Sequence, residues 1–485
     1  MTRRESTIKA LNFVLIFFGL LMLIPGVWDY CHNNNHYYYF VIIGVVGIAI
    51  GFLLNIFSIL TTKGAAYFAP RYGFLTVIMI WIFACIYTAL PLYFSIKGLG
   101  VTNAVFEAVS GLTSCGASVV VNLQHKSPGI LLWRSLLNYV GGLGIVVIGV
   151  AILPNLKIGG MQMFNMEFTE KSDKILPKVE SISIIIITIY MIMTTIGIFT
   201  LYSFGMSFFD AICHTLTAIS TGGFANYDNS VAYFKNFKID IILMVLMLFG
   251  ATSFIHFYHL QHQQFDKIRQ DVQFKYYLGT ILVIGTAVFL YNYLTKTYEL
   301  VNAIHYSFFN TISVLTTTGF ANTNYDNWHM FPKFCLIIAA IIGGMTGSTT
   351  GGIKVFRIVI LFKVIRNYIN TLIHPHGVFK IHYNGKYLND QVAMGAVIMV
   401  VSYFIVMMVG MLIMSLSNLD GITIISSVIS ALSNAGFGLG EHINPDGSFN
   451  NLPTFAKWNL IVLMIIGRLE IITFMVLINK NFWKK

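Results

Sequence analysis

Residues 303–322 read AIHYSFFNTISVLTTTGFAN, a semi-polar stretch that runs into a glycine-containing turn. The same pattern occurs in three other places, as AVFEAVSGLTSCGAS (104–118), FFDAICHTLTAISTGGFAN (208–226) and ITIISSVISALSNAGFGLG (422–440). An apolar span precedes each copy and another follows it. Internal repeats of about a hundred residues are too long for a solenoid, but they suit duplicated transmembrane units.

The four copies align on one glycine each. The aligned residues form tetrads 1 to 4, which are Thr113-Ser114-Cys115-Gly116, Ser220-Thr221-Gly222-Gly223, Thr316-Thr317-Thr318-Gly319 and Ser433-Asn434-Ala435-Gly436. An aromatic residue follows three of the glycines, as Phe224, Phe320 and Phe437. The tetrads therefore predict four equivalent turns.

The semi-polar stretch before each glycine is too short to cross a membrane. It has about 10 to 14 residues, whereas the hydrocarbon core is about 30 Å thick. Such a stretch must enter the membrane and turn back. Irregular backbone at that depth is tolerated only where it is buried in protein or lines a watery cavity. We therefore expect the four turns to line one cavity with their carbonyl groups.

Such a lining suits a dehydrated alkali cation, because rings of backbone carbonyls can replace its lost water. Glycine admits backbone conformations that a Cβ would obstruct, and the C-terminal end of each short helix carries partial negative charge. The tetrads contain hydroxyl groups and no carboxylate, which favours a monovalent ion. The alternative is structural, since glycines are also common packing points in membrane helices.

The composition is that of a membrane protein. Of 485 residues, 56% are hydrophobic and 10% are charged, and ten apolar stretches are long enough to span a bilayer, for example Ile182 to Phe204. The first of them, Phe13 to Trp28, has no cleavage site after it, so we interpret it as a retained span rather than a signal peptide.

The net charge of +11 reflects topology rather than nucleic-acid binding. With an even number of spans both termini lie on one side, and most of the Lys and Arg residues fall on that side. Because basic loops stay in the cytoplasm, we expect both termini to be cytoplasmic. The five Cys residues have no CxxC spacing, which favours neither a disulfide framework nor a zinc site.

After the third tetrad, residues 341–358 read IIGGMTGSTTGGIKVFRI. Five glycines, with Ser348, Thr349 and Thr350 among them, predict a break in the span, since each Gly costs about 1 kcal/mol in a helix interior. A phosphate-binding loop is excluded because Ile353 stands where the motif requires Lys. We interpret the run as a mobile plug beneath the turns, and a static kink is the alternative. Its residues are Gly343, Gly344, Met345, Thr346, Gly347, Ser348, Thr349, Thr350, Gly351 and Gly352.

Arg468 lies near the middle of the last apolar span, between Lys457 and Lys480. An arginine this deep costs several kcal/mol unless it faces a partner or water. Glu470, two positions on, does not share its helix face. We expect Arg468 to bind carbonyls of the glycine-rich run and to raise the barrier to cations. A purely structural arginine is the alternative.

The tetrads, the run GGMTGSTTGGIKVFR, the turn Gly141-Gly142-Leu143-Gly144 with AILP beyond it, and Arg468 resemble the TrkH branch of the Trk/Ktr/HKT potassium transporter superfamily. The resemblance implies an all-α membrane protein with four pseudo-repeats of helix, pore loop and helix around one central pore. The corresponding boundaries are an N-terminal two-helix hairpin at 1–66 and repeats at 67–160, 161–262, 263–375 and 376–485.

The resemblance also implies potassium uptake across the bacterial inner membrane, with K⁺ as the transported ion. It implies a homodimer with one pore per subunit, a gate formed by Gly343 to Gly352 with Arg468, and a cytosolic TrkA-like regulatory subunit that binds the nucleotide, so none is expected on this chain. The basic stretches Lys171 to Lys178 and Lys354 to Lys386 suit such docking. Cys115, Asn434 and Ala435 depart from the hydroxyl residues expected before the glycine, which leaves the ratio of potassium to sodium open.

Two other classes of function remain. An ion-coupled secondary transporter, driven by Na⁺ or H⁺, would be favoured by intramembrane acidic pairs, but these are scarce. Glu107 and Asp210 belong to the short helices, where we expect them to cap or to face water. A membrane enzyme is disfavoured because His256, His259 and His262 lack an HExxH motif and a third acidic ligand.

Overall fold

The computed structural model describes residues 3–61, 71–151, 179–443 and 448–483. Several residues named above lie outside this part of the chain, among them Ile152 to Pro154 of the AILP motif and the basic stretch Lys171 to Lys178.

The described residues are almost entirely helical. The helices are α1 (Arg3–Cys31), α2 (Tyr37–Thr61), α3 (Arg71–Ser95), α4 (Gly100–Leu112), α5 (Pro128–Ala151), α7 (Val179–Ser203), α8 (Phe208–Ile219), α9 (Phe237–Ala251), α10 (Phe254–Gln261), α11 (Phe265–Gln270), α12 (Val272–Leu294), α13 (Leu300–Leu315), α14 (Met330–Ile342), α15 (Val355–Ile373), α16 (Asp390–Ser415), α17 (Gly421–Ser433), α18 (Thr454–Arg468), α19 (Ile471–Ile478) and α20 (Lys480–Trp483). Short 3₁₀ turns lie at Leu123–His125, Ser230–Tyr233 and Tyr325–Asn327, and β1 (His382–Tyr383) pairs antiparallel with β2 (Lys386–Tyr387).

Six described helices are long and apolar enough to cross a membrane, namely α1, α2, α3, α7, α12 and α16. The number rises to eight when each of two bent pairs is taken as one span. The other two predicted spans correspond to α5 and to the pair α14 and α15, which the glycine-rich run separates. The protein is thus a multi-pass membrane protein.

Two predicted spans are sharply bent. Helices α9 and α10 meet at 97°, and α18 and α19 meet at 104°. Apolar composition predicted both as single spans, because hydropathy reports depth in the membrane and carries no information on direction. Both bends lie beside the glycine-rich run, as described below.

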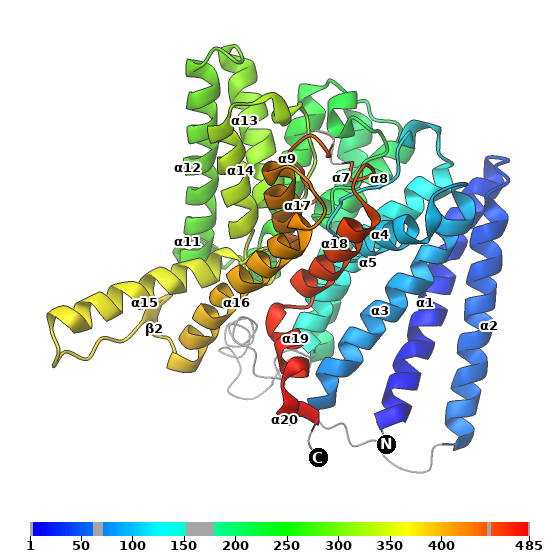
Figure 1. Cartoon of the computed structure of the whole chain (residues 1–485), viewed down its shortest axis with the longest axis horizontal. Coiled ribbons are helices and arrows are strands. Elements are labelled where there is room, and N and C mark those ends of the chain that lie inside the picture. Colours follow the sequence, from blue (N-terminus) through cyan, green and yellow to red (C-terminus); the bar gives the residue numbers. More distant parts are fainter. Residues whose placement is uncertain (1–2, 62–70, 152–178, 444–447, 484–485) are drawn as a thin grey trace.

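Figure 1 shows the arrangement of the helices. The hairpin of α1 and α2 lies at one side of the molecule, and α12, α13 and α14 lie at the other. Helix α1 begins and α20 ends at the same end of the molecule (Figure 1), as an even number of spans requires. The C-terminal halves of the short helices α4, α8, α13 and α17 are buried in the protein.

Candidate functional site

Each tetrad follows directly on a short helix. Helices α4, α8 and α13 end immediately before tetrads 1, 2 and 3, and α17 ends at the first residue of tetrad 4. Two of these helices, α8 and α17, begin at a capping side chain. The Ser207 side chain accepts a hydrogen bond from the Asp210 amide, and the Asp420 side chain accepts one from the Thr423 amide. The carbonyl ends of all four helices, with their partial negative charge, therefore face the tetrads.

The four tetrads share one backbone conformation. The residue two before the aligned glycine is left-handed in every case, with φ of 51° at Ser114, 50° at Thr221, 53° at Thr317 and 51° at Asn434. The glycines themselves have φ of 82° at Gly116, 69° at Gly223, 88° at Gly319 and 66° at Gly436. Left-handed backbone is costly for most residues. Packing between helices alone would not produce the same costly turn at four equivalent positions.

The tetrads contact one another in a closed ring. A Cβ added to any aligned glycine would lie closer than 3.0 Å to the carbonyl oxygen just before the glycine of the next tetrad. The contacts run from Gly116 to Gly222, from Gly223 to Thr318, from Gly319 to Ala435 and from Gly436 to Cys115. Glycine is required at each place because backbone meets backbone there.

Each tetrad is also tied back to its own short helix, at the residue three after the glycine. Asn310 donates to the Asn322 side chain at 2.8 Å, and Asn226 donates to Asp210 at 2.8 Å. The remaining two ties are the Val119 amide to Glu107 at 2.9 Å and the Leu439 amide to Ser426 at 3.1 Å. Four different kinds of side chain thus do the same thing: each fixes a turn against the short helix that precedes it.

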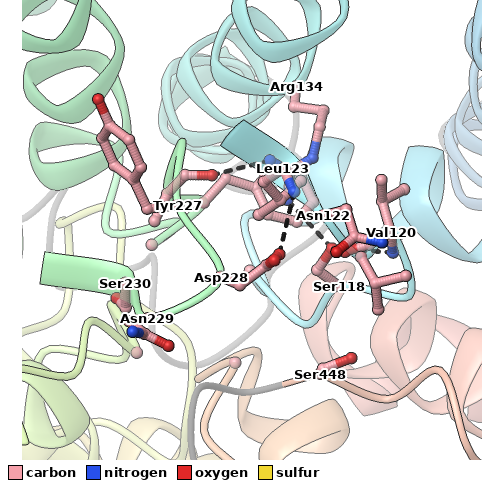
Figure 2. A pocket seen from close by; sticks show the side chains of 17 residues that line it. Ser118, Val120, Asn122, Leu123, Arg134, Tyr227, Asp228, Asn229, Ser230 and Ser448 are labelled. Atoms are coloured by element: carbon pink, nitrogen blue, oxygen red, sulfur yellow. Dashed lines mark hydrogen bonds between the residues drawn. The ribbon is translucent and has the colours of Figure 1, made fainter. Parts of the chain in front are cut away.

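A cavity of about 320 Å³ lies on one side of the ring and is lined by all four aligned glycines. Its wall continues through Ser118, Asn122 and the segment from Tyr227 to Ser230 (Figure 2). The Asp228 carboxylate accepts the Leu123 amide at 3.0 Å and joins the loop after tetrad 1 to the loop after tetrad 2. The cavity is an open approach to the ring.

The glycine-rich run covers the other side. The hydroxyls of Thr349 and Thr221 are 3.0 Å apart, and the Gly351 amide donates to the Thr317 hydroxyl at 2.9 Å. A Cβ on Gly351 would collide with the carbonyl of Ser433. The run therefore contacts tetrads 2, 3 and 4 directly.

The bend between α9 and α10 receives the same run. The amides of Met345 and Thr349 donate to the carbonyls of Ala251 and Gly250, at 3.1 and 3.3 Å, and the Phe254 amide donates to the carbonyl of Gly347 at 3.0 Å. These bonds pair backbone groups that the helix break would leave without partners. The bend between α9 and α10 thus provides backbone partners for the run.

Arg468 contacts the remaining tetrad. Its guanidinium donates to the Ser114 hydroxyl at 3.1 Å, to the Gly141 carbonyl at 3.0 Å and to the Thr349 carbonyl at 2.8 Å. The side chain is 4% exposed and stands at the last residue of α18, where a cation meets the helix carbonyl end favourably. The expected contact between Arg468 and a carbonyl of the run is present.

Comparison with known proteins agrees with this geometry. Residues 40–485 match the TrkH family, described as cation transport proteins. The chain belongs to the TrkH family. It is 36% identical to the Trk system potassium uptake protein TrkI of Halomonas elongata, over 86% of this chain and 85% of that protein. It is 32% identical to TrkH of Escherichia coli, over 98% of this chain and 99% of that protein.

A crystal structure of the potassium transporter TrkH from Vibrio parahaemolyticus has the same fold. It superposes with a TM-score of 0.90 at 30% sequence identity and covers 100% of both chains. The all-α membrane fold predicted from the sequence, and the resemblance to the TrkH branch, are therefore confirmed.

One expectation for this TrkH-family chain was wrong. Glu107 neither caps its helix nor faces water: it is fully buried and pairs with Arg134 at 2.7 Å. Arg357, within the basic stretch Lys354 to Lys386, is likewise buried: it is 2% exposed and pairs with Glu470 at 2.6 Å. In each case a second charge, distant in sequence, balances the first one within the protein.

The structure also places residues that the sequence interpretation missed. Glu470 lies in the break between α18 and α19, with φ of 64°. Helix-face periodicity assumes one continuous helix through Arg468 and Glu470, and therefore does not apply to Glu470. Arg134 was not singled out, although an arginine within LLWRSLLNYV (131–140) was a visible signal. In tetrad 1, the Cys115 thiol points away from the ring toward the Ser430 carbonyl of α17, at 3.8 Å.

Proposed function

We propose that the chain takes up potassium across the bacterial inner membrane through a pore whose selectivity filter is the ring of tetrads. The observation that carries the proposal is the closed series of contacts between each glycine and the carbonyl before the next one. Oxygens gathered in this way can replace the hydration shell of K⁺. The names of the relatives in Halomonas elongata and Escherichia coli, potassium uptake proteins, support the choice of ion.

The filter residues of this proposal are the last three of each tetrad. They contribute carbonyls rather than charged side chains, so the replacement of hydroxyl residues by Cys115 and Ala435 leaves the coordinating atoms in place. The lining contains Ser114, Cys115, Gly116, Thr221, Gly222, Gly223, Thr317, Thr318, Gly319, Asn434, Ala435 and Gly436.

The gate of the proposed pore is the run from Gly343 to Gly352 together with Arg468. Its support is that the run touches three tetrads while Arg468 touches the fourth and holds the Thr349 carbonyl. A positive charge beneath the filter raises the free energy of a passing cation. Movement of the run and of Arg468 away from the tetrads opens the path.

Regulation of this gate belongs to a cytosolic TrkA-like subunit that binds the nucleotide, and the pore chain forms a homodimer with its termini in the cytoplasm. Both assignments follow from the resemblance to the family. The boundaries at 66, 160, 262 and 375 then separate a hairpin and four repeats, each of which supplies one tetrad.

Rubidium uptake into a cell without its own potassium uptake systems tests the proposed function. The expected result is uptake that depends on this chain, is blocked by excess K⁺ and is little affected by excess Na⁺. Equal inhibition by Na⁺ and K⁺ would contradict the filter. Uptake that stops when the proton or sodium gradient is collapsed at constant membrane potential would favour the ion-coupled transporter instead.

A further inference from the structure

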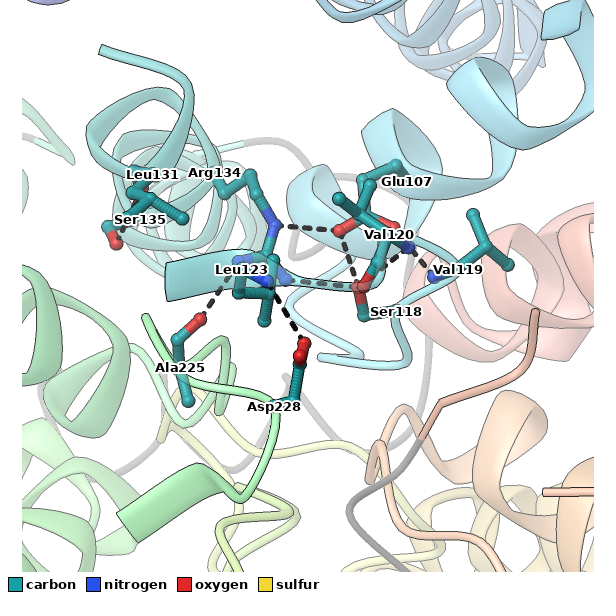
Figure 3. Close-up of polar contacts among 10 residues, drawn as sticks. All are labelled: Glu107, Ser118, Val119, Val120, Leu123, Leu131, Arg134, Ser135, Ala225 and Asp228. Carbon is teal, nitrogen blue, oxygen red and sulfur yellow. Dashed lines mark hydrogen bonds and ion pairs between the residues drawn. The ribbon is translucent and has the colours of Figure 1, made fainter. Parts of the chain in front are cut away.

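Glu107 of α4 and Arg134 of α5 form a buried ion pair behind the ring (Figure 3). Their side chains are 0% and 1% exposed, and 2.7 Å separates Oε1 from Nε. Burial of two charges is costly, and well-packed apolar residues are often as stable. A pair kept in such a place has a geometric task that apolar side chains cannot perform.

Arg134 reaches the exits of two tetrads at once. Its Nη2 donates to the Ser118 hydroxyl at 3.1 Å, and its Nη1 donates to the Ala225 carbonyl at 2.8 Å. Ser118 stands two residues after Gly116, and Ala225 stands two residues after Gly223. One rigid guanidinium therefore fixes the distance between the chains that leave tetrads 1 and 2 (Figure 3).

The guanidinium also stacks against tetrad 2. Its central carbon lies 4.2 Å from the centre of the Phe224 ring, directly after Gly223. Tetrad 2 is the one with two consecutive glycines, Gly222 and Gly223. Glycine has the least intrinsic restraint on its backbone, so the Gly222 carbonyl depends most on groups outside its own tetrad.

Glu107 holds the guanidinium and tetrad 1 together. One carboxylate oxygen accepts from Arg134 and from the Ser118 hydroxyl, at 2.7 and 2.9 Å, and the other accepts the Val119 amide at 2.9 Å. All three partners are donors, so the side chain at position 107 must accept hydrogen bonds at both of its terminal atoms. A glutamine would turn its NH₂ group toward one of these donors.

The other contacts between neighbouring loops have a different chemistry. Between the loops of tetrads 2 and 3, the Ala232 amide donates to the Ala321 carbonyl at 3.1 Å, and Asp240 at the start of α9 accepts from the Asn322 side chain at 2.9 Å. Between those of tetrads 3 and 4, Asp326 accepts the Gly440 amide at 3.3 Å. Lys333 and His305 also lie at these contacts, but they pair with the carboxylates, Lys333 with Asp326 at 3.1 Å and His305 with Asp240 at 2.9 Å. Arg134 instead donates directly to a main-chain carbonyl two residues beyond the filter glycine.

We propose that Glu107 and Arg134 are positioning residues for ion selectivity, which set the spacing of the tetrad 1 and tetrad 2 carbonyls. The inference rests on the proposed function and adds residues outside the tetrads that determine selectivity. The pair does not touch the ion. It restrains the two chains that would otherwise move apart and accept an ion of another radius.

Arg134→Lys and Glu107→Gln test the inference in liposomes, with rubidium uptake measured in competition with sodium. Lysine keeps the charge and one bond to Glu107, but it cannot bridge Ser118 and Ala225 together. Each variant is expected to lower the discrimination against sodium by about tenfold, because the loss of one charge-assisted hydrogen bond corresponds to about that factor in an equilibrium constant. A folded Arg134→Lys protein with wild-type discrimination would overturn the proposal.

Asp29→Asn is the matched control. Asp29 is also a fully buried carboxylate, and it accepts the Gly129 amide at 2.7 Å near the start of α5, away from the tetrads. It is expected to keep wild-type discrimination. If neither single variant folds, Glu107→Leu with Arg134→Met leaves no buried charge unpaired, and wild-type discrimination in that protein would overturn the proposal as well.

Gly116→Ser separates this inference from the filter itself. Lost discrimination in Gly116→Ser with normal discrimination in Arg134→Lys would refute only the role of the pair. Normal discrimination in both variants would refute the filter. Lost discrimination in both, with Asp29→Asn unchanged, is the expected result.

Discussion

The hydroxyl of Thr221 in tetrad 2 lies 3.0 Å from the hydroxyl of Thr349 in the glycine-rich run. The two residues are 128 positions apart in sequence and belong to the proposed filter and the proposed gate. The Thr349 hydroxyl is also 3.0 Å from the Gly250 carbonyl. A single side chain thus joins the ring, the run and the bend between α9 and α10.

Thr349→Val should increase rubidium flux in the absence of a regulatory subunit. The substitution removes the hydroxyl with little change of volume, and each lost hydrogen bond weakens the covered state by about 1 kcal/mol. Flux through purified protein in liposomes should rise about fivefold. Thr88→Val is the control, because Thr88 is buried in α3 and its hydroxyl donates to carbonyls of that helix, those of Ala84 and Cys85. Unchanged flux in a folded Thr349→Val protein would contradict the gate.

Arg468→Ala should raise flux more than Thr349→Val does. It removes both the charge below the filter and the bonds to Ser114, Gly141 and Thr349. Removal of residues 345–350 should act in the same direction. Lys457→Met, at the other end of α18, is the control for loss of a basic side chain. Lower flux from correctly folded Arg468→Ala protein would mean that the arginine assists the ion instead of obstructing it.

Gly116→Ser should weaken discrimination against sodium by tenfold or more, because its Cβ collides with the Gly222 carbonyl of the neighbouring tetrad. Gly98→Ser is an unusually close control. Gly98 has φ of 80° against 82° for Gly116, but a Cβ there meets nothing within 4 Å. Both variants carry similar backbone strain, and only Gly116→Ser disturbs the ring. Competition of sodium with rubidium uptake measures the difference, and equal behaviour of the two variants would argue against a carbonyl filter.

Asp271→Asn should lower the melting temperature near neutral pH and have less effect in acid. Burial raises the pKa of Asp271, but hydrogen bonds from His256, Asn384 and the Gln273 amide outweigh burial and hold the pKa below its ordinary value. A lowered pKa in the folded state means that the ionised carboxylate stabilises the fold above about pH 4, and that this contribution is lost as pH falls through the lowered pKa.

The loss at pH 7 should be about 2 kcal/mol, the worth of a hydrogen bond to a charged group. Thermal unfolding in detergent between pH 3.5 and 7 measures it. Asp390→Asn, at an exposed aspartate in the first turn of α16, should show little change at any pH. A difference between wild type and Asp271→Asn that grows on acidification would contradict the assignment.

The sequence was sufficient for the fold class and for the residues of the ring. Four glycines after helices too short for a membrane leave few other arrangements. The left-handed backbone at Ser114, Thr221 and Thr317 was not predictable, because Ser and Thr rarely adopt it. The break at the glycine-rich run was also predictable, since α14 ends at Ile342 and α15 begins at Val355. These features depend on local backbone preference.

Contacts between distant segments were not predictable in the same way. The pairs Glu107 with Arg134 and Arg357 with Glu470 join different helices, and a single sequence does not state which charges meet. The 104° bend after Arg468 was missed for a related reason. The residues on the two sides of the bend have distant partners, since Arg468 donates to the Thr349 carbonyl and Glu470 pairs with Arg357.

Anomalous diffraction from crystals soaked in rubidium tests the central claim most directly. The ring of tetrads should show rubidium on its axis, within coordination distance of carbonyl oxygens from all four tetrads, and the signal should disappear when potassium replaces rubidium. Rubidium bound elsewhere in the membrane-spanning region, with an empty ring, would contradict the account.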